Sequence, residues 1–531
     1  MPAENQWVGE VNAYRTAIPQ FPQTYIMTNT SSNKRIAKNT MLLYFRMIVI
    51  MGVTLFTSRV ILQSLGIDDY GIYNVVGGVV SMFSFISASL ATASQRFITF
   101  ELGKGGIGDV SNVFSTCLYI HILLAIVIAI IIEPIGLWFI KNKLMIPEER
   151  LSAAIWVFHF SILSMAVMII GASFNALIIA HESMNAFALV SIVDAGLRLG
   201  IAYSLLAFDT FDRLIIYGLL IFLAQCICTL CYALFCKKSY KNVRYSGRAD
   251  RILLIKMAKF ASWSVFGNVA FLTYTQGLNL LLGSFFSPVV NTARGVAVQI
   301  QGAVNCFVSS FQTAINPQIT KNYAAGNLRE MIKLVFCSSR FSFYLLMILT
   351  VPVLLRTQDI LTIWLGNVPD HTVSFVQLIL ITTWINSIAN PLIISVKATG
   401  NIKRYESTVG SLMIAILPIS YIFLRLGYPP EIVFVVHLTI ESLAMIFRIW
   451  ITRSLINFSL IEYVKNVMIR VLVVASFSFL LSYLISEKLP NGFWPTILLF
   501  MISAVISIIM VMLIGLETNE RIYIFSKIKR R

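Results

Sequence analysis

The sequence predicts an all-α integral membrane protein with about fourteen transmembrane helices. Hydrophobic residues make up 57% of its 531 residues and charged residues only 12%, whereas soluble domains carry roughly 25% charged residues. The apolar residues form continuous runs of 18 or more, which as helices cross a hydrocarbon core about 30 Å thick. Barrel strands would instead show alternation over about ten residues. Helices therefore satisfy the backbone of each run.

The runs divide the chain into a twelve-helix core and two further helices. They lie near residues 40–63, 70–93, 112–133, 153–177, 187–207, 214–236, 260–282, 289–314, 334–355, 373–396, 406–426, 431–452, 466–485 and 494–515.

Lys and Arg are concentrated in alternate gaps between the runs. The gaps on the side of the N-terminus hold roughly 26 of these residues and the opposite gaps about 7, which places the first set in the cytoplasm. Both termini are therefore expected in the cytoplasm. Because the net charge of +17 is distributed in this way, it indicates membrane topology and no nucleic-acid partner.

The same gaps give the expected domain organisation. The densest cluster of cations, at residues 237–256, predicts a cytoplasmic linker between two six-helix lobes. The full division is a disordered cytoplasmic segment (1–33), an N-terminal lobe (34–236), the linker (237–256), a C-terminal lobe (257–453), helices 13 and 14 (454–516) and a basic cytoplasmic tail (517–531). Residues 1–26 are expected either to be disordered or to lie upstream of a native start at Met27.

A weak internal repeat supports the two lobes. An offset of 221 residues places Thr92, Ala93, Ile98, Thr99 and Gly105 over Thr313, Ala314, Ile319, Thr320 and Gly326. These positions are the ends of the second and eighth spans. Since each half has six spans, both halves have the same topology, which predicts a parallel repeat around a central cavity.

Arginines inside the spans are the first candidate ligand contacts, because intramembrane charge is costly and faces the bundle interior. Arg46 and Arg59 lie in the first span and point roughly 140° apart, so they cannot share a face. Arg46 is the better cavity candidate. Arg59, near the outer end, either binds substrate or extends to the interface. Arg294 has no acidic residue within one turn and is a third candidate.

Two further groups combine acidic and basic residues. Asp194 and Arg198 are four residues apart in the fifth span, which predicts either an ion pair or a coupling and binding site. His437, Glu441 and Arg448 lie on one face of the twelfth span. This stripe either relays protons or packs helices together, and packing is the simpler interpretation.

Other motifs add little. Pro391 interrupts the tenth span and is a hinge candidate, because proline removes a backbone hydrogen bond. The sequence contains no phosphate-binding loop, His-Glu-x-x-His motif or nucleophile elbow, so no nucleotide, metal, cofactor or catalytic residue is predicted. A transporter is favoured over a membrane-embedded glycosyltransferase or scaffold.

The first two spans resemble a known family. The Arg59–Gly66 segment, the sequence Asp69-Tyr70-Gly71-Ile72-Tyr73 and the sequence Gln95-Arg96-Phe97 resemble bacterial polysaccharide flippases, the O-antigen and capsule transporters of the multidrug, oligosaccharidyl-lipid and polysaccharide exporter superfamily. The resemblance extends more loosely over the twelve-helix core. With fourteen spans, the chain also resembles the lipid II flippase branch.

The resemblance implies a bacterial inner-membrane flippase that moves undecaprenyl-pyrophosphate-linked oligosaccharide outward by alternating access, beside the polysaccharide polymerase machinery. Arginine suits pyrophosphate because it presents paired planar donors. The alternative is a cation-coupled multidrug exporter of the same superfamily, which would use Asp194, His437 or Glu441 with a proton or sodium gradient. The small number of intramembrane carboxylates favours the lipid-linked sugar.

Overall fold

The computed structural model describes residues 29–81, 83–105, 109–142, 144, 146–205, 212–243, 250–517 and 520–521, and this part of the chain is helical with no strand. The helices are α2 (Asn29–Ser81), α3 (Ser84–Gly103), α4 (Val110–Asn142), α5 (Glu148–Ala180), α6 (Met184–Ser204), α7 (Arg213–Ser239), α8 (Arg251–Phe285), α9 (Pro288–Ala324), α10 (Leu328–Leu355), α11 (Thr357–Leu365), α12 (Thr372–Thr399), α13 (Lys403–Arg425), α14 (Ile432–Ile456), α15 (Leu460–Tyr463), α16 (Arg470–Ser486) and α17 (Phe493–Met510).

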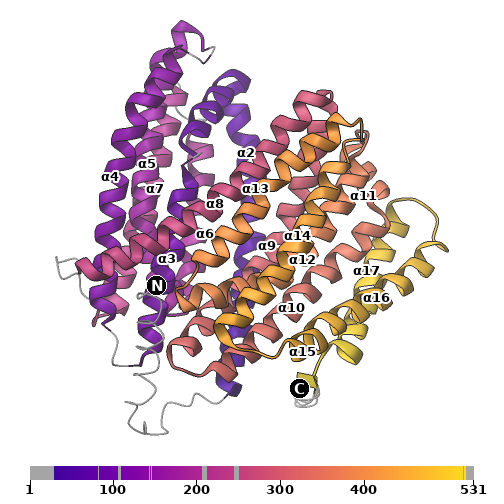
Figure 1. Ribbon diagram of the computed structural model, residues 1–531. Coiled ribbons are helices and arrows are strands. Elements are labelled where there is room, and N and C mark those ends of the chain that lie inside the picture. The colour runs from indigo at the N-terminus through magenta and orange to yellow at the C-terminus, as the bar shows by residue number, and fades with distance from the viewer. Residues whose placement is uncertain are drawn as a thin grey trace.

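The helices form two bundles that lie side by side (Figure 1). In the N-lobe, α2–α7, helix α5 packs against α3, α4 and α7. In the C-lobe, α8–α14, helix α12 packs against α9, α10 and α14. The lobes meet where α2 and α3 contact α9 and where α3 contacts α8. The second and eighth spans are therefore at the boundary between the lobes.

The predicted repeat appears in the helix boundaries. Shifted by 221 residues, α12 falls on residues 151–178, which matches α5 (Glu148–Ala180). The same shift places α13 on α6 and α14 on α7. It also places α9 on residues 67–103, which are the end of α2 and α3. These four matched segments support the parallel repeat predicted from a few sequence matches.

Twelve helices in the described ranges are long and apolar enough to cross a membrane, and two of the fourteen predicted spans, the second and the eighth, are not among them. The second is divided between the end of α2 and the start of α3, around a turn at Phe83. The eighth corresponds to α9, which is one continuous helix but carries many Gln, Asn, Ser and Thr residues. The break in the helix explains the first difference, and the polar composition of α9 explains the second.

The chain turns sharply between the first and second spans at Gly66, whose φ is +81° and ψ is 172°. A residue with a side chain rarely adopts this conformation. Nearby, Arg150 of α5 binds Asp69 of α2 and also binds Asp212, which caps α7 and lies 2.6 Å from Arg150. These ion pairs hold α2, α5 and α7 together at the turn.

The last two spans form a hairpin against the C-lobe. Helices α16 and α17 pack on each other and on α10, and they lie at the edge of the molecule (Figure 1). Arg340 of α10 is buried and pairs with Glu517 at 2.5 Å and Glu520 at 2.6 Å. The start of the predicted basic tail is therefore acidic and is anchored to the core.

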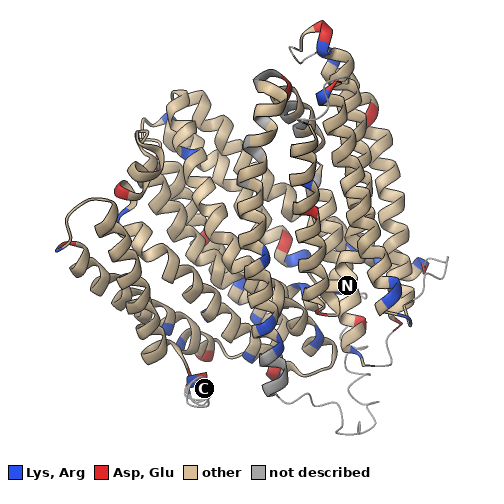
Figure 2. Ribbon diagram, turned by 180° about the vertical axis from the view of Figure 1, so that it is seen from behind, with Lys and Arg blue, Asp and Glu red and all other residues tan. Residues whose placement is uncertain are grey.

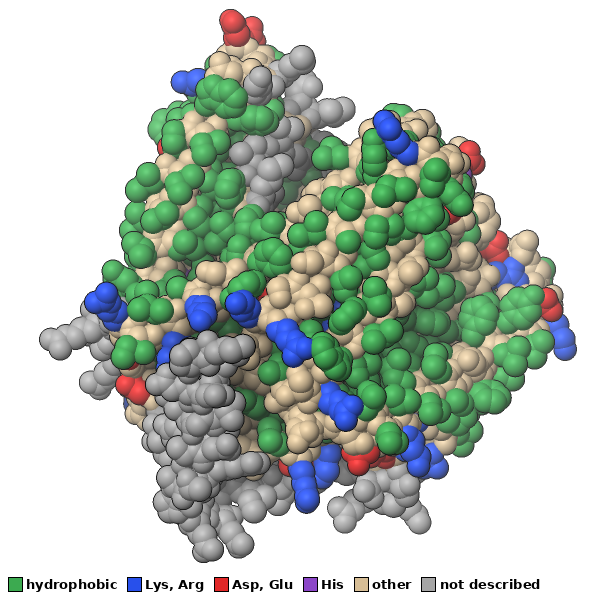
Figure 3. All heavy atoms as spheres, in the orientation of Figure 1, with side chains coloured by type: hydrophobic (Ala, Val, Ile, Leu, Met, Phe, Trp, Pro, Cys, Tyr) green, Lys and Arg blue, Asp and Glu red, His purple; other side chains and the backbone are tan. Residues whose placement is uncertain are grey.

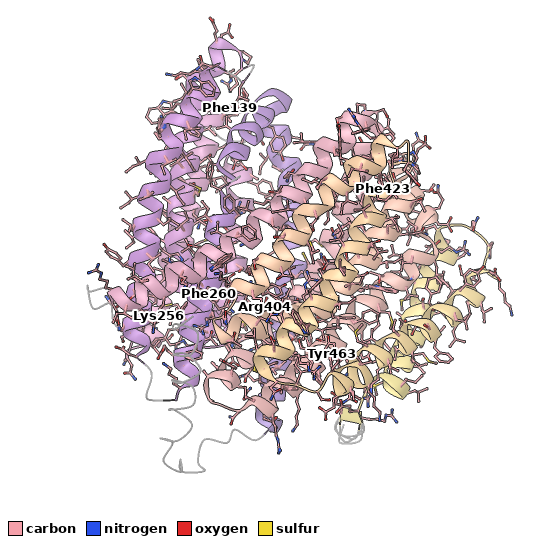
Figure 4. The ribbon with its side chains drawn as sticks, in the orientation of Figure 1. Phe139, Lys256, Phe260, Arg404, Phe423 and Tyr463 are labelled. Carbon is pink, nitrogen blue, oxygen red and sulfur yellow. The ribbon has the colours of Figure 1, made fainter. Side chains whose placement is uncertain are left out.

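The bundle has two distinct ends. One end, which we call the linker end, has the α5–α6, α7–α8, α9–α10 and α12–α13 connections. The other, which we call the opposite end, has the α4–α5, α8–α9 and α13–α14 connections. Most Lys and Arg residues lie in the half of the molecule nearer the linker end (Figures 2 and 3). In the space-filling view, the opposite end is indented between the lobes (Figure 3). Phe139 and Phe423 lie near that end of the two lobes (Figure 4).

The predicted boundaries differ from the structure in two places. Helix α2 begins at Asn29, so residues 29–33 of the segment expected to be disordered are helical, and residues 1–28 lie outside the described part. Helix α7 continues to Ser239 and α8 begins at Arg251, so the connection between the lobes is shorter than residues 237–256. Lys237 and Lys238 belong to the last turn of α7, where cations favour the helix dipole.

Candidate functional site

The first candidate site is centred on Arg46, on the α2 helix where it meets the C-lobe. Its guanidinium lies 4.3 Å from the ring centroid of Phe187 in α6. Its Nε is buried with no hydrogen-bond partner in the described part of the chain. No described carboxylate lies within ion-pair distance. Asp194 and Tyr232 of the N-lobe and Cys306 of the C-lobe lie close enough to act on its charge.

The α2 segment around Arg46 lies at the lobe boundary, since the ring centroid of Tyr44 lies 6.0 Å from that of Phe307 in α9. Residues two apart on a helix point about 160° apart, so this contact does not orient Arg46 itself. The proximity of Cys306 in α9 is what places the Arg46 charge near the C-lobe. Among the described residues, the Arg46 guanidinium has an aromatic contact and no hydrogen-bond acceptor for Nε, so it retains N–H donors for an anionic ligand.

Asp194 and Arg198 form the predicted ion pair, with Arg198 Nε 3.0 Å from Asp194 Oδ2. The thiol of Cys228 in α7 donates to the other carboxylate oxygen at 3.7 Å. The Arg198 side chain is 48% exposed, so this pair is not a sealed core contact. Tyr73 and Tyr217, whose rings lie 4.6 Å apart, are close enough to Arg198 to interact with its charge. Arg46, Asp194 and Arg198 thus share one polar region of the N-lobe.

Arg294 lies in the C-lobe and is more enclosed than Arg46. It is 6% exposed. One guanidinium nitrogen donates to Asn279 Oδ1, and another donates to the carbonyl oxygen of Thr275 at 2.8 Å, so α8 holds most of the group. Among the described residues it has no carboxylate partner, and its Nε is unpaired. The structure does not place Arg294 beside Arg46.

The His437, Glu441 and Arg448 stripe faces the interior of the C-lobe. Arg448 binds Glu441 and donates from Nε to the Tyr405 hydroxyl of α13 at 3.2 Å. The ring of His437 lies 5.0 Å from that of Tyr274 in α8, and its Nε2 is buried without a described partner. This arrangement joins α8, α13 and α14, and the choice between a packing role and a proton relay stays a prediction.

Pro391 is buried in α12, and its effect on the backbone is compensated. A proline removes the hydrogen bond to the carbonyl four residues earlier, here that of Ser387. The side chain of Gln312 in α9 donates to this carbonyl at 3.3 Å. Neighbouring helices commonly satisfy backbone groups freed by proline in membranes. The contact ties α12 to α9 at the proposed hinge.

Several functional candidates escaped the sequence analysis, and one predicted residue cannot be placed. Arg59 has a side chain that lies outside the described residues. Glu182, in the α5–α6 turn, and Arg96 in α3 both contact the other lobe. Glu406 is buried in the first turn of α13. The sequence feature that could have pointed to Glu182 is a single acidic residue in the short gap between two apolar spans. Arg96 lay within a family motif but had no assigned role.

The charged residues of the linker end also affect a histidine outside the spans. Burial lowers the pKa of His181, which follows the last residue of α5, and the nearby Lys321 acts in the same direction. Its ring stacks on Tyr240 with centroids 4.0 Å apart. In the described ranges no group of three or more His, Cys, Asp or Glu residues is arranged to hold a metal ion.

No protein-family model and no curated protein matches the chain. Similar solved structures do exist. A multidrug resistance MATE-family transporter of the MOP superfamily, in an outward-facing conformation, aligns with a TM-score of 0.68 at 14% identity, over 80% of this chain and 96% of that one. A Vibrio cholerae MATE transporter in a bent form aligns at 0.64 and 14% identity, over 81% and 98%.

A third similar structure is described by the polarity of its own binding pocket. It is a MOP-superfamily transporter from Pyrococcus furiosus, described as having a binding pocket of reverse polarity that suggests a different function. It aligns with a TM-score of 0.66 at 12% identity, over 80% of this chain and 96% of that one. The chain thus has the fold of MOP-superfamily membrane transporters, and identities this low establish the fold alone.

Proposed function

We propose that this chain is an alternating-access transporter of the bacterial inner membrane that moves an undecaprenyl-pyrophosphate-linked oligosaccharide outward. The observation that carries the proposal is Arg46, a cation without a described carboxylate partner on the N-lobe surface that meets α9. A pyrophosphate is polyanionic, and guanidinium donors match its oxygens in pairs. Arg198, half exposed beside Asp194, supplies a second cation to the same region.

The topology supports the direction of transport. The concentration of Lys and Arg at the linker end supports a cytoplasmic location for that end. The lobes are in contact there and the surface is indented at the opposite end (Figure 3). Such an arrangement is that of an outward-facing state. The motif resemblance in the first two spans supports a lipid-linked sugar as the cargo.

A second candidate is a cation-coupled exporter of small molecules. Two of the compared structures are MATE transporters, and one is described as a multidrug resistance transporter. The fold comparison therefore favours this candidate over the flippase. Glu441 and Glu406 are carboxylates buried in the C-lobe, and a proton or sodium gradient could act on them or on Asp194. The charge of Glu441 is already neutralised by Arg448, so Glu441 is a weaker candidate for coupling to an ion gradient.

One experiment separates the two candidates. The purified chain is reconstituted in proteoliposomes with either a fluorescent undecaprenyl-pyrophosphate oligosaccharide or a cationic dye, with and without a proton or sodium gradient. The proposal predicts protein-dependent movement of the lipid-linked sugar and no gradient-driven dye export. Dye export without lipid movement would establish the second candidate.

A further inference from the structure

A buried carboxylate joins the two lobes at the linker end. Glu182 lies in the turn between α5 and α6, and its side chain is only 1% exposed. It accepts from Lys321 Nζ at 2.6 Å and from Gln318 Nε2 at 2.5 Å, both on α9 of the C-lobe. Arg35 of α2 approaches the same carboxylate at 2.8 Å. Removal of this one charge would leave two cations without their shared partner.

A second contact joins the lobes with the roles exchanged, because here the N-lobe supplies the cation and the C-lobe supplies the acceptors. Arg96 of α3 donates from Nε to the carbonyl oxygen of Lys397 at 3.2 Å and from Nη2 to that of Ala398 at 3.0 Å. Both carbonyls belong to the last turn of α12, where the helix dipole favours a cation. The guanidinium also lies 5.8 Å from the ring of Phe260 in α8, which is labelled on the linker side of the bundle (Figure 4).

The two contacts correspond under the internal repeat. Helix α9 matches α3, and α12 matches α5. Each of these matched helices, α5 and α12, is followed by a residue of positive φ, which is Glu182 at 60° and Gly400 at 82°. In the first contact Lys321 of α9 reaches the turn after α5, and in the second Arg96 of α3 reaches the last turn of α12.

The chemistry of the two turns differs in a way that points to a role for the carboxylate. Positive φ is common for glycine and uncommon for glutamate, and such residues persist where their surroundings fix them. At Gly400 an added Cβ would lie 2.7 Å from Arg96 Nη2, so glycine lets the arginine approach the backbone. At Glu182, the side chain itself provides the acceptor.

We propose that these two contacts are a paired latch that closes the linker end, and that both must release together for the chain to open toward that side. The proposal rests on the proposed function, because opening belongs to the transport cycle. The Glu182 half is ionic and depends on one carboxylate. The Arg96 half uses main-chain acceptors, so it depends on the arginine and on the space that Gly400 leaves for it.

The test measures the distance between the lobes in the full-length chain in lipid nanodiscs. Spin labels on noncanonical amino acids replace the exposed Ser239 of α7 and Arg329 of α10, so the native cysteines stay in place. Wild type is expected to give one dominant short distance. Glu182→Gln and Arg96→Gln, from different parts of the latch, should each increase the population of a longer distance at least fivefold.

The matched control is Glu330→Gln, which removes a carboxylate at the same end from an exposed ion pair within α10. It should leave the distances unchanged. If both contacts act on one equilibrium between a short and a long distance, their effects should combine in the double variant. The increase in its long-to-short population ratio should then equal the product of the increases in the two single variants. Unchanged distances in both single variants would overturn the latch, as would a lower melting temperature without a longer distance. No substrate is present in this experiment, so its result does not depend on whether the proposed substrate is correct.

Discussion

The ion pair between Glu441 and Arg448 offers a sharp test of how the C-lobe is held together. The two side chains are 2% and 6% exposed, so Glu441→Gln would leave the Arg448 charge buried without its counter-ion. Removal of one partner of a buried pair costs about 3–5 kcal/mol. The free energy of unfolding should fall by this amount in mixed micelles, followed by tryptophan fluorescence across a denaturant series.

Replacement of the whole polar cluster should reverse most of this loss. Buried ion pairs exchanged for apolar residues of similar volume are often neutral or stabilising. Since Arg448 also donates to the Tyr405 hydroxyl, the variant must be Glu441→Leu/Arg448→Met/Tyr405→Phe, because an orphaned hydroxyl alone costs about 1–3 kcal/mol. We expect stability within about 1 kcal/mol of wild type. Equal instability in the single and triple variants, or no loss in Glu441→Gln, would refute the reasoning.

The same variants address function, because a packing cluster is dispensable for transport and a proton relay is not. Retained transport in the triple variant would assign the stripe to packing. Lost transport in a stable triple variant would assign it to coupling.

Two further predictions concern the linker end and the α8–α13 contact. His181 has a lowered pKa when folded, so the unfolded chain binds more protons and stability should fall as pH decreases below about 6.5. His181→Gln should flatten this acid-side decline in melting temperature, and an unchanged slope would contradict the assignment. At Gly267 an added Cβ would lie 2.0 Å from Glu406 Oε2, whereas at Gly295 nothing lies within 4 Å. Gly267→Ala must displace the Glu406 carboxylate, which is buried, and should destabilise by about 1–3 kcal/mol. Gly295→Ala should stabilise slightly, and equal effects in the same denaturant series would disprove the close contact.

Much of the fold follows from the sequence because hydrophobic length is a direct physical requirement of a bilayer. The exceptions are instructive. Helix α9 is polar where it meets the N-lobe, and the second span is broken between α2 and α3. Apolarity identifies surfaces that meet lipid or core, so spans at a boundary between lobes give the weakest signal.

The candidate site could be predicted only within single helices. Helical spacing predicted the pair of Asp194 and Arg198 and placed Glu441 and Arg448 on one face. Contacts between distant segments were beyond this reasoning. Nothing in the sequence joins Glu182 to Lys321, which lies 139 residues away. Which way a helix rotates depends on packing against its neighbours.

The central claim is that Arg46 holds an anionic headgroup, and the most direct measurement is the initial rate at which proteoliposomes flip a fluorescent undecaprenyl-pyrophosphate oligosaccharide. Loss of a charge-assisted contact worth about 1.5–3 kcal/mol should lower the rate of Arg46→Gln about 10- to 100-fold. The control Arg329→Gln, which removes an exposed cation of the C-lobe, should keep the wild-type rate. Equal rates in wild type and Arg46→Gln, at equal protein content, would contradict the account.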